Sequence, residues 1–577
     1  MKILLTTLNA KYVHSNLALR YLRGVCPQEE IEIREYTIND RLDVVAGDIY
    51  KAGAQVIGFS CYIWNIEQTL ELAGILRQVS PETAIIFGGP EVSYDPGQYL
   101  ASADYVIFGE GERTFQALIE LLNSGGKNGV DPSAIPGLAY HGAAGPEINS
   151  ARELIRDLGA IPSPYATLDG LENKIAYVES SRGCPFNCQY CLSSTIQGVR
   201  FFPAERTKTE LKKLVEAGVK QVKFVDRTFN CHKPHTLDLM KFIAAWNPPA
   251  NFHFEISADL LDEETLEFLQ GVPAGLFQFE VGVQSTNSET LDLIQRRTDL
   301  DKLQGNVLRV AKGGNIAQLL DLIAGLPGED YRSFAQSFNE VYALGPDKLQ
   351  LGFLKMLKGS GVRQRAEEWG YKYTSAPPYR VLANQWLSHF ELLRLQVIED
   401  LVDRFFNSGR FHKSLCFLIQ RFSGGPFAMF EDLAEFWETR GLHRQAHNAR
   451  TLYDLLYEYC LAREFDGEKF RQLLKFDYLM WERPTKVPEW FSSGEIPGYK
   501  ERAESFFRTG ILNLMPQLNQ VSKREINKAF HLEPFDPGIA AELAVEFPDT
   551  GEPLYLLFYY PGQLLKAPRP GFIPVMI

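Results

Sequence analysis

The sequence predicts an α/β protein whose last part is mostly helical. Over residues 1–145, short apolar runs alternate with helical patterns, which predicts a doubly wound parallel sheet. Six further strand–helix pairs over residues 175–358 predict a second α/β domain. Amphipathic helical patterns dominate residues 359–577. Residues 146–174 contain prolines that break the periodicity, as expected of a stiff linker.

The composition of the chain is that of an ordinary globular protein with an acidic balance. Of its 577 residues, 45% are hydrophobic and 23% charged, and the net charge is −13. Because a broad nucleic-acid footprint needs a basic face, we expect no nucleic-acid partner. The sequence contains no apolar run long enough to suggest a membrane span, and its first residues read as a strand rather than a signal. Scattered free cysteines suit a reducing compartment, so we expect a cytoplasmic protein without a membrane partner.

Five apolar runs in the first domain predict its buried strands, and a helical pattern over residues 66–76 predicts one intervening helix. Ligands of such sheets bind beyond the carboxyl ends of the strands. The expected strands cover residues 2–7, 31–36, 55–60, 84–88 and 104–109.

A dense cysteine motif follows the first strand of the second domain. Cys184, Cys188 and Cys191 have the spacing C-x3-C-x2-C and make up three of the eight cysteines of the chain. Thiolates are the usual ligands of a [4Fe–4S] cluster, and three of them leave one iron open to a ligand that is not protein. The alternative is a zinc knuckle, but Cys231 and His232, the next candidates for a fourth ligand, lie far downstream.

The string from Ser180 to Cys191 resembles the motif of the radical S-adenosylmethionine (SAM) superfamily. The resemblance implies that the open iron chelates the amino and carboxylate groups of SAM. It also implies that an electron from the cluster cleaves SAM to methionine and a 5′-deoxyadenosyl radical.

The strand–helix pairs of the second domain match the partial (β/α)6 barrel of that superfamily. Catalytic groups of parallel barrels lie at the carboxyl ends of the strands, where the polar residues of this domain also fall. The expected strands cover residues 175–179, 221–226, 251–257, 276–284, 317–324 and 348–356.

The same resemblance implies where SAM binds. The end of the second strand would approach the methionine amino group, Glu255 and Ser257 the ribose, and Ile323 to Gly325 the adenine. Arg296 would meet the carboxylate, with Arg297 as the rival. The expected SAM-binding residues are Tyr190, Asp226, Arg227, Glu255, Ser257, Gln284, Arg296, Ile323 and Gly325.

The first domain resembles the cobalamin-binding domain of cobalamin-dependent radical SAM enzymes, because its strand-end loops look like the loops of that family. The resemblance places the nucleotide tail of cobalamin among these loops, although the shape of Gly88-Gly89 alone favours an ordinary tight strand-to-helix turn. The sequence contains no D-x-H motif, so no histidine of that kind would bind cobalt, and His14 reads as a hydrogen-bonding residue. The expected cobalamin contacts are Asn9, Ser60, Tyr62, Trp64, Gly88, Gly89, Pro90, Gly109, Glu110 and Glu112.

The last part resembles an uncharacterised C-terminal extension found on some of these enzymes. A long amphipathic helix is expected over residues 381–406, and a hairpin is expected from residues 544–547 and 554–560. Five of the seven tryptophans follow residue 360, either as core residues or as the lining of an apolar substrate pocket.

The resemblance implies a cobalamin-dependent radical SAM methyltransferase that acts on an unactivated carbon or a phosphinate, with a [4Fe–4S] cluster, SAM and cobalamin as cofactors. The alternatives are a radical rearrangement, ring contraction or cyclisation, and a non-catalytic module that senses cobalamin or SAM. RNA methylthiolation lacks support, because the sequence has no basic RNA-binding appendage. The expected partners are an unknown small-molecule or peptide substrate and an electron donor such as flavodoxin or ferredoxin.

Overall fold

The computed structural model describes the whole chain except residues 128, 197, 485–486, 492–495, 547–551 and 561–569. The chain divides into two units, Met1–Leu392 and Leu393–Ile577. The first unit contains both predicted α/β domains, and also the segment that follows the second of them. In the described residues, no helix is both long and apolar enough to cross a membrane.

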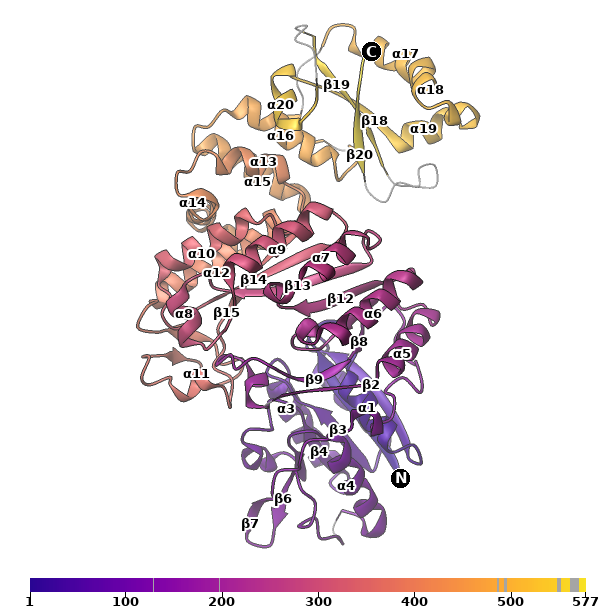
Figure 1. Ribbon diagram of the computed structural model, residues 1–577, viewed down its shortest axis with the longest axis vertical. Coiled ribbons are helices and arrows are strands. Elements are labelled where there is room, and N and C mark those ends of the chain that lie inside the picture. Colours follow the sequence, from indigo (N-terminus) through magenta and orange to yellow (C-terminus); the bar gives the residue numbers. More distant parts are fainter. Residues whose placement is uncertain (128, 197, 485–486, 492–495, 547–551, 561–569) are drawn as a thin grey trace. The chain divides into compact units, whose positions relative to one another are not determined.

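The first domain is built on a parallel sheet with the strand order β2-β1-β3-β4-β5, which is the flavodoxin-like order (Figure 1). Strand β1 is buried on both faces, because its apolar residues alternate between two cores: Leu4 and Leu8 belong to one, and Ile3 and Leu5 to the other. The strands are β1 (Lys2–Asn9), β2 (Glu30–Thr37), β3 (Val56–Ser60), β4 (Ala84–Gly88) and β5 (Tyr105–Ile107).

Helices cover both faces of this sheet. Helices α2 (Leu42–Lys51) and α3 (Ile66–Val79) pack on one face, and α1 (Leu17–Val25) and α4 (Glu112–Gly125) on the other. An antiparallel pair that the sequence did not predict, β6 (Leu138–Gly142) and β7 (Gly145–Ile148), extends the sheet beyond β5.

The second domain contains a six-stranded, all-parallel sheet with the order β15-β14-β13-β12-β11-β8. The strands run in sequence order from one edge to the other, with helices between them, as in a partial (β/α)6 barrel, so the predicted fold class is confirmed (Figure 1). The strands are β8 (Ala176–Val178), β11 (Gln221–Phe224), β12 (Asn251–Ile256), β13 (Phe277–Gln284), β14 (Ala317–Ala324) and β15 (Lys348–Phe353).

The helices of this domain cover the outer face of its sheet. Strand β14 shows how the sequence separates the two faces: Leu320, Leu322 and Ala324 are buried under the helices, whereas Asp321 and Ile323 alternate with them and reach the inner face. The helices are α5 (Ala204–Glu216), α6 (Lys233–Trp246), α7 (Glu263–Gln270), α8 (Ser288–Leu293), α9 (Leu300–Gly313) and α10 (Tyr331–Ala343).

Residues 354–384, which we call the strap, follow β15 and pack with the first unit. Two short antiparallel strands, β16 (Lys372–Tyr373) and β17 (Val381–Ala383), lie within the strap. The predicted helix over residues 381–406 is therefore wrong at its start, and α12 (His389–Leu401) begins later. Ser388 and Glu391 form a reciprocal cap, in which the Glu391 carboxylate accepts from the Ser388 backbone N–H at 2.8 Å.

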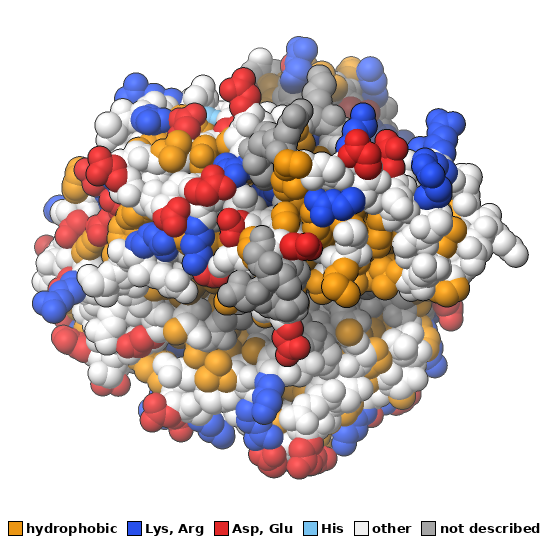
Figure 2. All heavy atoms as spheres, turned by 90° about the horizontal axis from the view of Figure 1, so that it is seen from above, with side chains coloured by type: hydrophobic (Ala, Val, Ile, Leu, Met, Phe, Trp, Pro, Cys, Tyr) orange, Lys and Arg blue, Asp and Glu red, His pale blue; other side chains and the backbone are white. Residues whose placement is uncertain are grey.

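The second unit is mostly helical, with one antiparallel sheet in the order β18-β19-β20. The predicted hairpin is wrong, because residues 544–546 are not a strand and β19 pairs with β18 and β20 instead. Residues 547–551 lie outside the described residues. On the face in Figure 2, acidic and basic side chains are interspersed with hydrophobic ones. The main elements are α13 (His412–Ile419), α14 (Gly425–Thr439), α15 (Ala449–Ala462), α16 (Gly467–Leu479), β18 (Phe530–Phe535), β19 (Leu554–Tyr559) and β20 (Gly571–Val575).

Candidate active site

A cavity of about 420 Å³ lies at the carboxyl ends of the barrel strands. The cysteine loop lines one part of it, and residues from β12, β13, β14 and β15 line the rest. This is the end of a parallel barrel at which active sites are found. The residues from the cysteine loop are Cys184, Phe186, Cys188, Tyr190, Cys191, Ser193 and Ser194.

A two-stranded antiparallel ribbon, β9 (Ser181–Cys184) and β10 (Gly198–Phe201), carries the start of the cysteine loop. Gly183 lies opposite Val199 in this ribbon and has a φ of +98°. A Cβ atom at Gly183 would collide with the backbone carbonyl of Gly198, so the close approach of the two strands requires glycine. Further along the loop, the Gln189 backbone N–H donates to the Ile294 carbonyl at 2.9 Å. These contacts hold the loop against the barrel.

The three thiols of the motif lie on the wall of the cavity, each next to a polar group. The Cys184 sulfur is 3.5 Å from the Thr228 hydroxyl, and the Cys191 sulfur accepts from the Ser193 backbone N–H at 3.4 Å. The Cys188 sulfur is 3.7 Å from the Arg296 guanidinium. In the described chain, no three His, Cys, Asp or Glu side chains are gathered closely enough to enclose a single metal ion.

This donor set fits an iron–sulfur cluster that faces the cavity. All three sulfur atoms come from one loop, and the cavity adjoins them on the side where a fourth, non-protein ligand would bind. Hydrogen-bond donors at cluster sulfur ligands are a common feature of such sites, and Ser193 and Arg296 supply them here.

Arg296, one of the predicted SAM ligands, contacts the cysteine loop through Cys188 and Tyr190. Its guanidinium donates to the Tyr190 hydroxyl at 3.3 Å and to the Gly282 carbonyl. Its Nε atom is buried and has no hydrogen-bond partner in the described structure. Arg297, the rival candidate, is exposed and does not line the cavity.

Most of the other predicted SAM-binding residues also line the cavity. Glu255 and Ser257 come from β12 and the residue after it, Gln284 from β13 and Ile323 from β14, while Arg227 follows β11. Burial raises the pKa of the Glu255 carboxyl, and the ammonium of Lys223 opposes that rise. Strands that lie far apart in the sequence thus bring these side chains to one cavity.

Asp226 was predicted to lie among the SAM-binding residues but does not line the cavity. Its carboxylate is buried and accepts from the Ser180 N–H at 2.9 Å, the Ser180 hydroxyl at 2.7 Å and the Ser181 hydroxyl at 2.6 Å. Burial raises its pKa to about 6. These hydrogen bonds of Asp226 therefore fix the start of the cysteine loop at Ser180 and Ser181.

Gly325 also lies outside the residues that line the cavity. Its carbonyl accepts from the Tyr371 hydroxyl at 2.8 Å and from the Asn384 amide at 3.1 Å, both on the strap. The backbone after β14 therefore holds the strap in place, and Ile323 is the residue of this stretch that faces the cavity.

The inner face of the barrel carries ionisable residues that sequence reasoning did not select as site residues. Lys223 lies 2.9 Å from Glu280 and 3.5 Å from Glu255, and His253 bonds to the same Glu280 carboxylate at 2.8 Å. Burial raises the pKa of Asp321 to about 8, and the Glu280 and Glu255 charges add to that rise. The alternation of strand residues could have identified them, because all lie on the inward-facing positions.

In the first domain, the loop after β3 presents an aromatic pair. The Tyr62 and Trp64 rings stack with their centroids 4.3 Å apart and an interplanar angle of 7°, and Trp64 is 45% exposed. The polar residues predicted nearby are engaged with the fold: the Ser60 hydroxyl accepts from Asn16, and the Asn9 amide donates to the His14 carbonyl. An exposed aromatic surface next to buried polar loops suits the face of a large planar ligand.

Glycines with a positive φ occupy the turns at two other strand ends of the first domain. Gly89 has a φ of +121°, and a Cβ there would lie 2.5 Å from the Cys61 carbonyl oxygen. Gly109 has a φ of +77° and no atoms near the position of its missing Cβ. Gly88 and Pro90 flank Gly89 in the same turn. The turn at Gly109 thus has open space beside its backbone, whereas glycine is required at Gly89 by the close approach of the Cys61 backbone.

Glu110 and Glu112 are held by arginines of the cysteine ribbon. Glu110 pairs with Arg200 at 2.8 Å and with Arg182 at 3.5 Å, and Glu112 pairs with Arg182 at 2.6 Å. Arg182 also bonds to Glu179 at 2.9 Å. These carboxylates join the first domain to the cysteine loop, a role that their place at a strand end did not predict.

His14 lies between the two domains of the first unit. Its Nδ1 atom is 2.6 Å from the Tyr177 hydroxyl of β8, and burial lowers the pKa of the imidazole. This agrees with the reading of His14 as a hydrogen-bonding residue.

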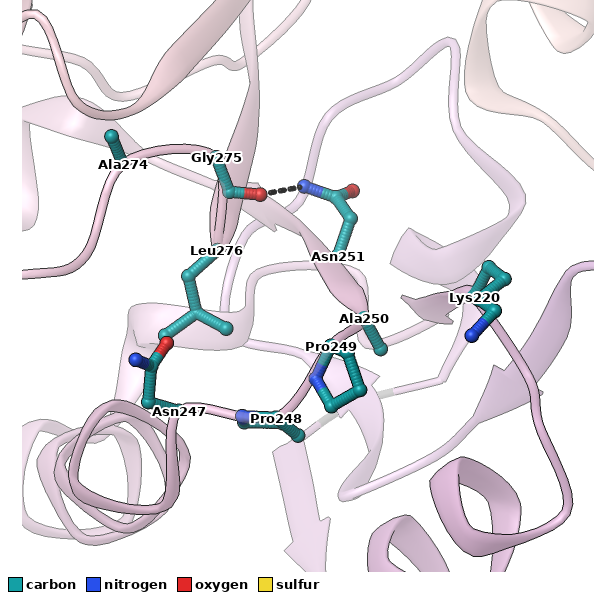
Figure 3. Close-up of a pocket in the computed structure, with 9 residues that line it drawn as sticks. All are labelled: Lys220, Asn247, Pro248, Pro249, Ala250, Asn251, Ala274, Gly275 and Leu276. Carbon is teal, nitrogen blue, oxygen red and sulfur yellow. Dashed lines mark hydrogen bonds between the residues drawn. The ribbon is translucent and has the colours of Figure 1, made fainter. Parts of the chain in front are cut away.

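A second hollow lies at the opposite, amino-terminal ends of the barrel strands (Figure 3). The Asn251 amide donates to the Gly275 carbonyl at 2.9 Å across it, and prolines 248 and 249 form its edge. Its lining contains a single ionisable residue, Lys220. The active sites of parallel barrels lie at the opposite, carboxyl ends of the strands. The cavity at the cysteine loop is therefore the candidate active site.

Three family models match separate parts of the chain. The B12 binding domain model matches residues 3–119, and the radical SAM superfamily model matches residues 178–341. A third model, described as a protein of unknown function (DUF4080), matches residues 367–558.

Curated relatives match about half of the chain. The 2-(S-pantetheinyl)-carbapenam-3-carboxylate methyltransferase of Streptantibioticus cattleyicolor is 30% identical over 328 residues, which is 50% of this chain and 45% of that protein. The cobalamin-dependent radical SAM methyltransferase TokK of Streptomyces tokunonensis is 27% identical over 326 residues, again 50% and 45% of the two chains. An anaerobic magnesium-protoporphyrin IX monomethyl ester cyclase of Rubrivivax gelatinosus is 22% identical over 304 residues, 49% of this chain and 52% of that protein.

Among solved structures, the cobalamin-dependent SAM radical enzyme OxsB with aqua-cobalamin bound is similar in fold. It has a TM-score of 0.57 and 15% sequence identity, and the similarity covers 88% of this chain and 75% of that chain. The chain spans about half the length of the curated relatives it matches.

Proposed function

We propose that the chain is a cobalamin-dependent radical SAM methyltransferase that acts on an unactivated carbon or a phosphinate, because the B12 binding and radical SAM models match it and a relative is a methyltransferase of this kind. The observation that carries this proposal is the cavity at the carboxyl end of the barrel. Three thiols of one loop and residues from the ends of four strands line it. The names of the two methyltransferases among the relatives support methyl transfer over other radical reactions.

The cofactors that fit these domains are a [4Fe–4S] cluster, SAM and cobalamin. When bound, the cluster and SAM supply a radical that abstracts hydrogen, and cobalamin supplies the methyl group. The protein contributes binding, orientation and exclusion of water, and each of these tasks can be assigned to particular residues.

The residues around the cysteine loop would hold the methionine end of SAM. Arg296 would bind the carboxylate, because its guanidinium lies between Cys188 and Tyr190 and its Nε atom is left without a partner in the described structure. Glu255 and Ser257 would bind the ribose hydroxyls, and Ile323 would pack against adenine. This order follows the cavity wall from the cysteine loop to β14.

The first domain would hold cobalamin through the turns at Gly89 and Gly109 and the exposed pair Tyr62 and Trp64. We propose no histidine ligand at cobalt, because the sequence contains no D-x-H motif; the Nδ1 atom of His14 bonds to Tyr177. We also propose that a flavodoxin or ferredoxin supplies the electron, and that the substrate is a small molecule or peptide.

A radical cyclisation without methyl transfer is the second candidate, because one relative is named as a cyclase. The mass of the product separates the two candidates, since methylation adds one methyl group and a rearrangement adds none. Metabolite mass spectrometry of cells with and without the gene provides this test. The proposed function requires a pair of compounds that differ by one methyl group. A pair of isomers, or a pair that differs only by hydrogen, would favour cyclisation instead.

A further inference from the structure

Two cations of the strap face each other at the rim of the active-site cavity without an acidic partner. Lys355 lines the cavity directly after β15, and Arg380 lies opposite it in an antiparallel bridge. Both side chains reach solvent, and that of Lys355 is partly shielded by the cavity wall. Neither forms an ion pair with any residue that the structure describes.

The backbone bonds around this bridge fix how the two side chains lie. The Met356 N–H donates to the Tyr379 carbonyl at 2.9 Å, and the Val381 N–H donates to the Leu354 carbonyl at 3.4 Å. Lys355 and Arg380 are therefore a non-hydrogen-bonded pair, the type in which opposed side chains are closest and point to the same face.

Two like charges that lie directly opposite each other across a strand pair repel and destabilise the pair. Partial burial and the Arg380 charge both lower the pKa of Lys355. Two other cations of the strap are partnered: Lys358 lies 2.9 Å from the Tyr99 hydroxyl and 3.5 Å from the Glu91 carboxylate, and Arg363 donates to the Met356 carbonyl at 2.7 Å. The charges of Lys355 and Arg380 are thus left for a ligand.

The place of this pair separates it from the predicted carboxylate site of SAM. Arg296 bonds to the Gly282 carbonyl on β13, whereas Lys355 follows β15, two strands further along the sheet. Neighbouring strands lie about 4.8 Å apart, so the two cationic positions differ by roughly 10 Å. Strand β14 lies between the two positions, and its Asp321 side chain lines the cavity there, so a carboxyl group separates the two cationic positions.

We propose that Lys355 and Arg380 bind an oxyanion of the substrate, a carboxylate or a phosphorus oxyanion, and so place the substrate at the rim of the cavity. This inference rests on the proposed function, because it takes the cavity to be the reaction site. It narrows the substrate to molecules that carry an acidic group at some distance from the reacting carbon.

Pyridoxal 5′-phosphate is a suitable probe, because its aldehyde forms an imine with a lysine amine while its phosphate offers the oxyanion. The full-length protein, loaded with cluster and cobalamin, is labelled without oxygen, the imine is reduced with cyanoborohydride, and the labelled peptides are quantified by mass spectrometry. A charged hydrogen bond to the phosphate should favour Lys355 labelling by roughly tenfold over labelling by pyridoxal, which lacks the phosphate. The exposed Lys372 of β16 serves as the internal control and should show no such preference.

The preference at Lys355 should disappear in Arg380→Gln and return in Arg380→Lys. Protection of Lys355 by inorganic phosphate would indicate a phosphorus oxyanion, and protection by succinate a carboxylate. Equal labelling by the two reagents, or no protection by either anion, would overturn the inference. Protection by SAM alone would also overturn it, because the pair would then serve the cofactor. SAM cleavage by the unlabelled protein is measured separately, so a failure of the proposed function is distinguishable from a failure of the anion site.

Discussion

At the scale of single residues, the clearest choice that the structure makes is between Arg296 and Arg297. The two are adjacent in the sequence, and nothing in the residue types separates them. Arg296 reaches Cys188, Tyr190 and the cavity, whereas Arg297 is exposed. Which of two neighbours faces a site depends on the exact backbone path after α8, and the sequence does not reveal that path.

We expect Arg296→Gln to weaken SAM binding. Removing one partner of a buried charge pair costs about 2–5 kcal/mol, which corresponds to a rise in the dissociation constant of roughly 30-fold or more. Equilibrium dialysis with radiolabelled SAM measures this directly on the cluster-loaded protein. Arg297→Gln is the matched control and should bind SAM like the wild type; equal weakening by both variants would contradict the assignment.

The cysteines give a second prediction at this scale. Cys184→Ala, Cys188→Ala and Cys191→Ala should each lose the [4Fe–4S] cluster, because the loop supplies only three thiolates and the cluster needs all three. Cys231→Ala is the control: its thiol is partly buried, and burial raises its pKa to about 11. Iron content and the visible absorbance spectrum after anaerobic reconstitution distinguish the variants. Loss of iron from Cys231→Ala would show that the cluster has a fourth protein ligand.

At the scale of elements, the sequence predicted the strands well where they are continuous apolar runs. All five parallel strands of the first domain and all six of the second overlap the ranges predicted from the sequence. Strands β1, β3 and β4 are buried apolar runs, as strands covered on both faces need to be, whereas the edge strand β2 alternates and is only partly buried. The short ribbon β9–β10 and the pair β6–β7 were missed, since they are held by partners distant in sequence rather than by periodicity.

The same limit applies to the site. Strand-end positions were predicted, but a side chain at such a position can turn toward the cavity or away from it. Glu255 and Ile323 turn inward, whereas Asp226 turns to Ser180 and Ser181, and Gly325 turns to the strap. Contacts between distant segments, such as Glu112 with Arg182, leave no local signal in the sequence.

The turn after β4 supplies a prediction at the element scale. Gly89→Ala should destabilise the first domain by about 1–3 kcal/mol, because it strains a left-handed backbone and places a Cβ against the Cys61 carbonyl. Cobalamin retention should fall as well. Gly47→Ala in α2 is the control, since its Cβ would meet nothing within 4 Å. Thermal unfolding and the cobalt content of the purified proteins report both effects; unchanged cobalamin retention in a folded Gly89→Ala protein would exclude this turn from the binding site.

At the scale of the whole molecule, the first unit extends beyond residue 358, where the sequence predicted that the barrel domain ends. Residues 359–392 belong to the first unit, and the strap bonds to Gly325 through Tyr371 and Asn384 and to Glu91 through Tyr379. The strap thus connects the end of the barrel to the first domain. The remaining residues form a unit of their own, for which a role in substrate turnover stays a prediction.

Two truncated proteins test this division. A protein that ends after Leu401, the last residue of α12, should bind iron and cobalamin and cleave SAM slowly, but form no methylated product. A protein that ends after Gly359 should be less stable, because it lacks most of the strap and its bonds to Gly325 and Glu91. Normal product formation by the first protein would show that the second unit is a separate module.

The central claim is that the protein is a methyltransferase in which SAM and the cluster supply the radical and cobalamin supplies the methyl group. We propose that a second SAM molecule is the source of the methyl group on cobalamin. The most direct measurement is an anaerobic reaction with SAM carrying a deuterated methyl group, an electron donor and an extract from cells that lack the gene. The account predicts that 5′-deoxyadenosine and S-adenosylhomocysteine both form, and that the product carries the deuterated methyl group. Formation of 5′-deoxyadenosine with an unlabelled product, or of neither compound, would contradict it.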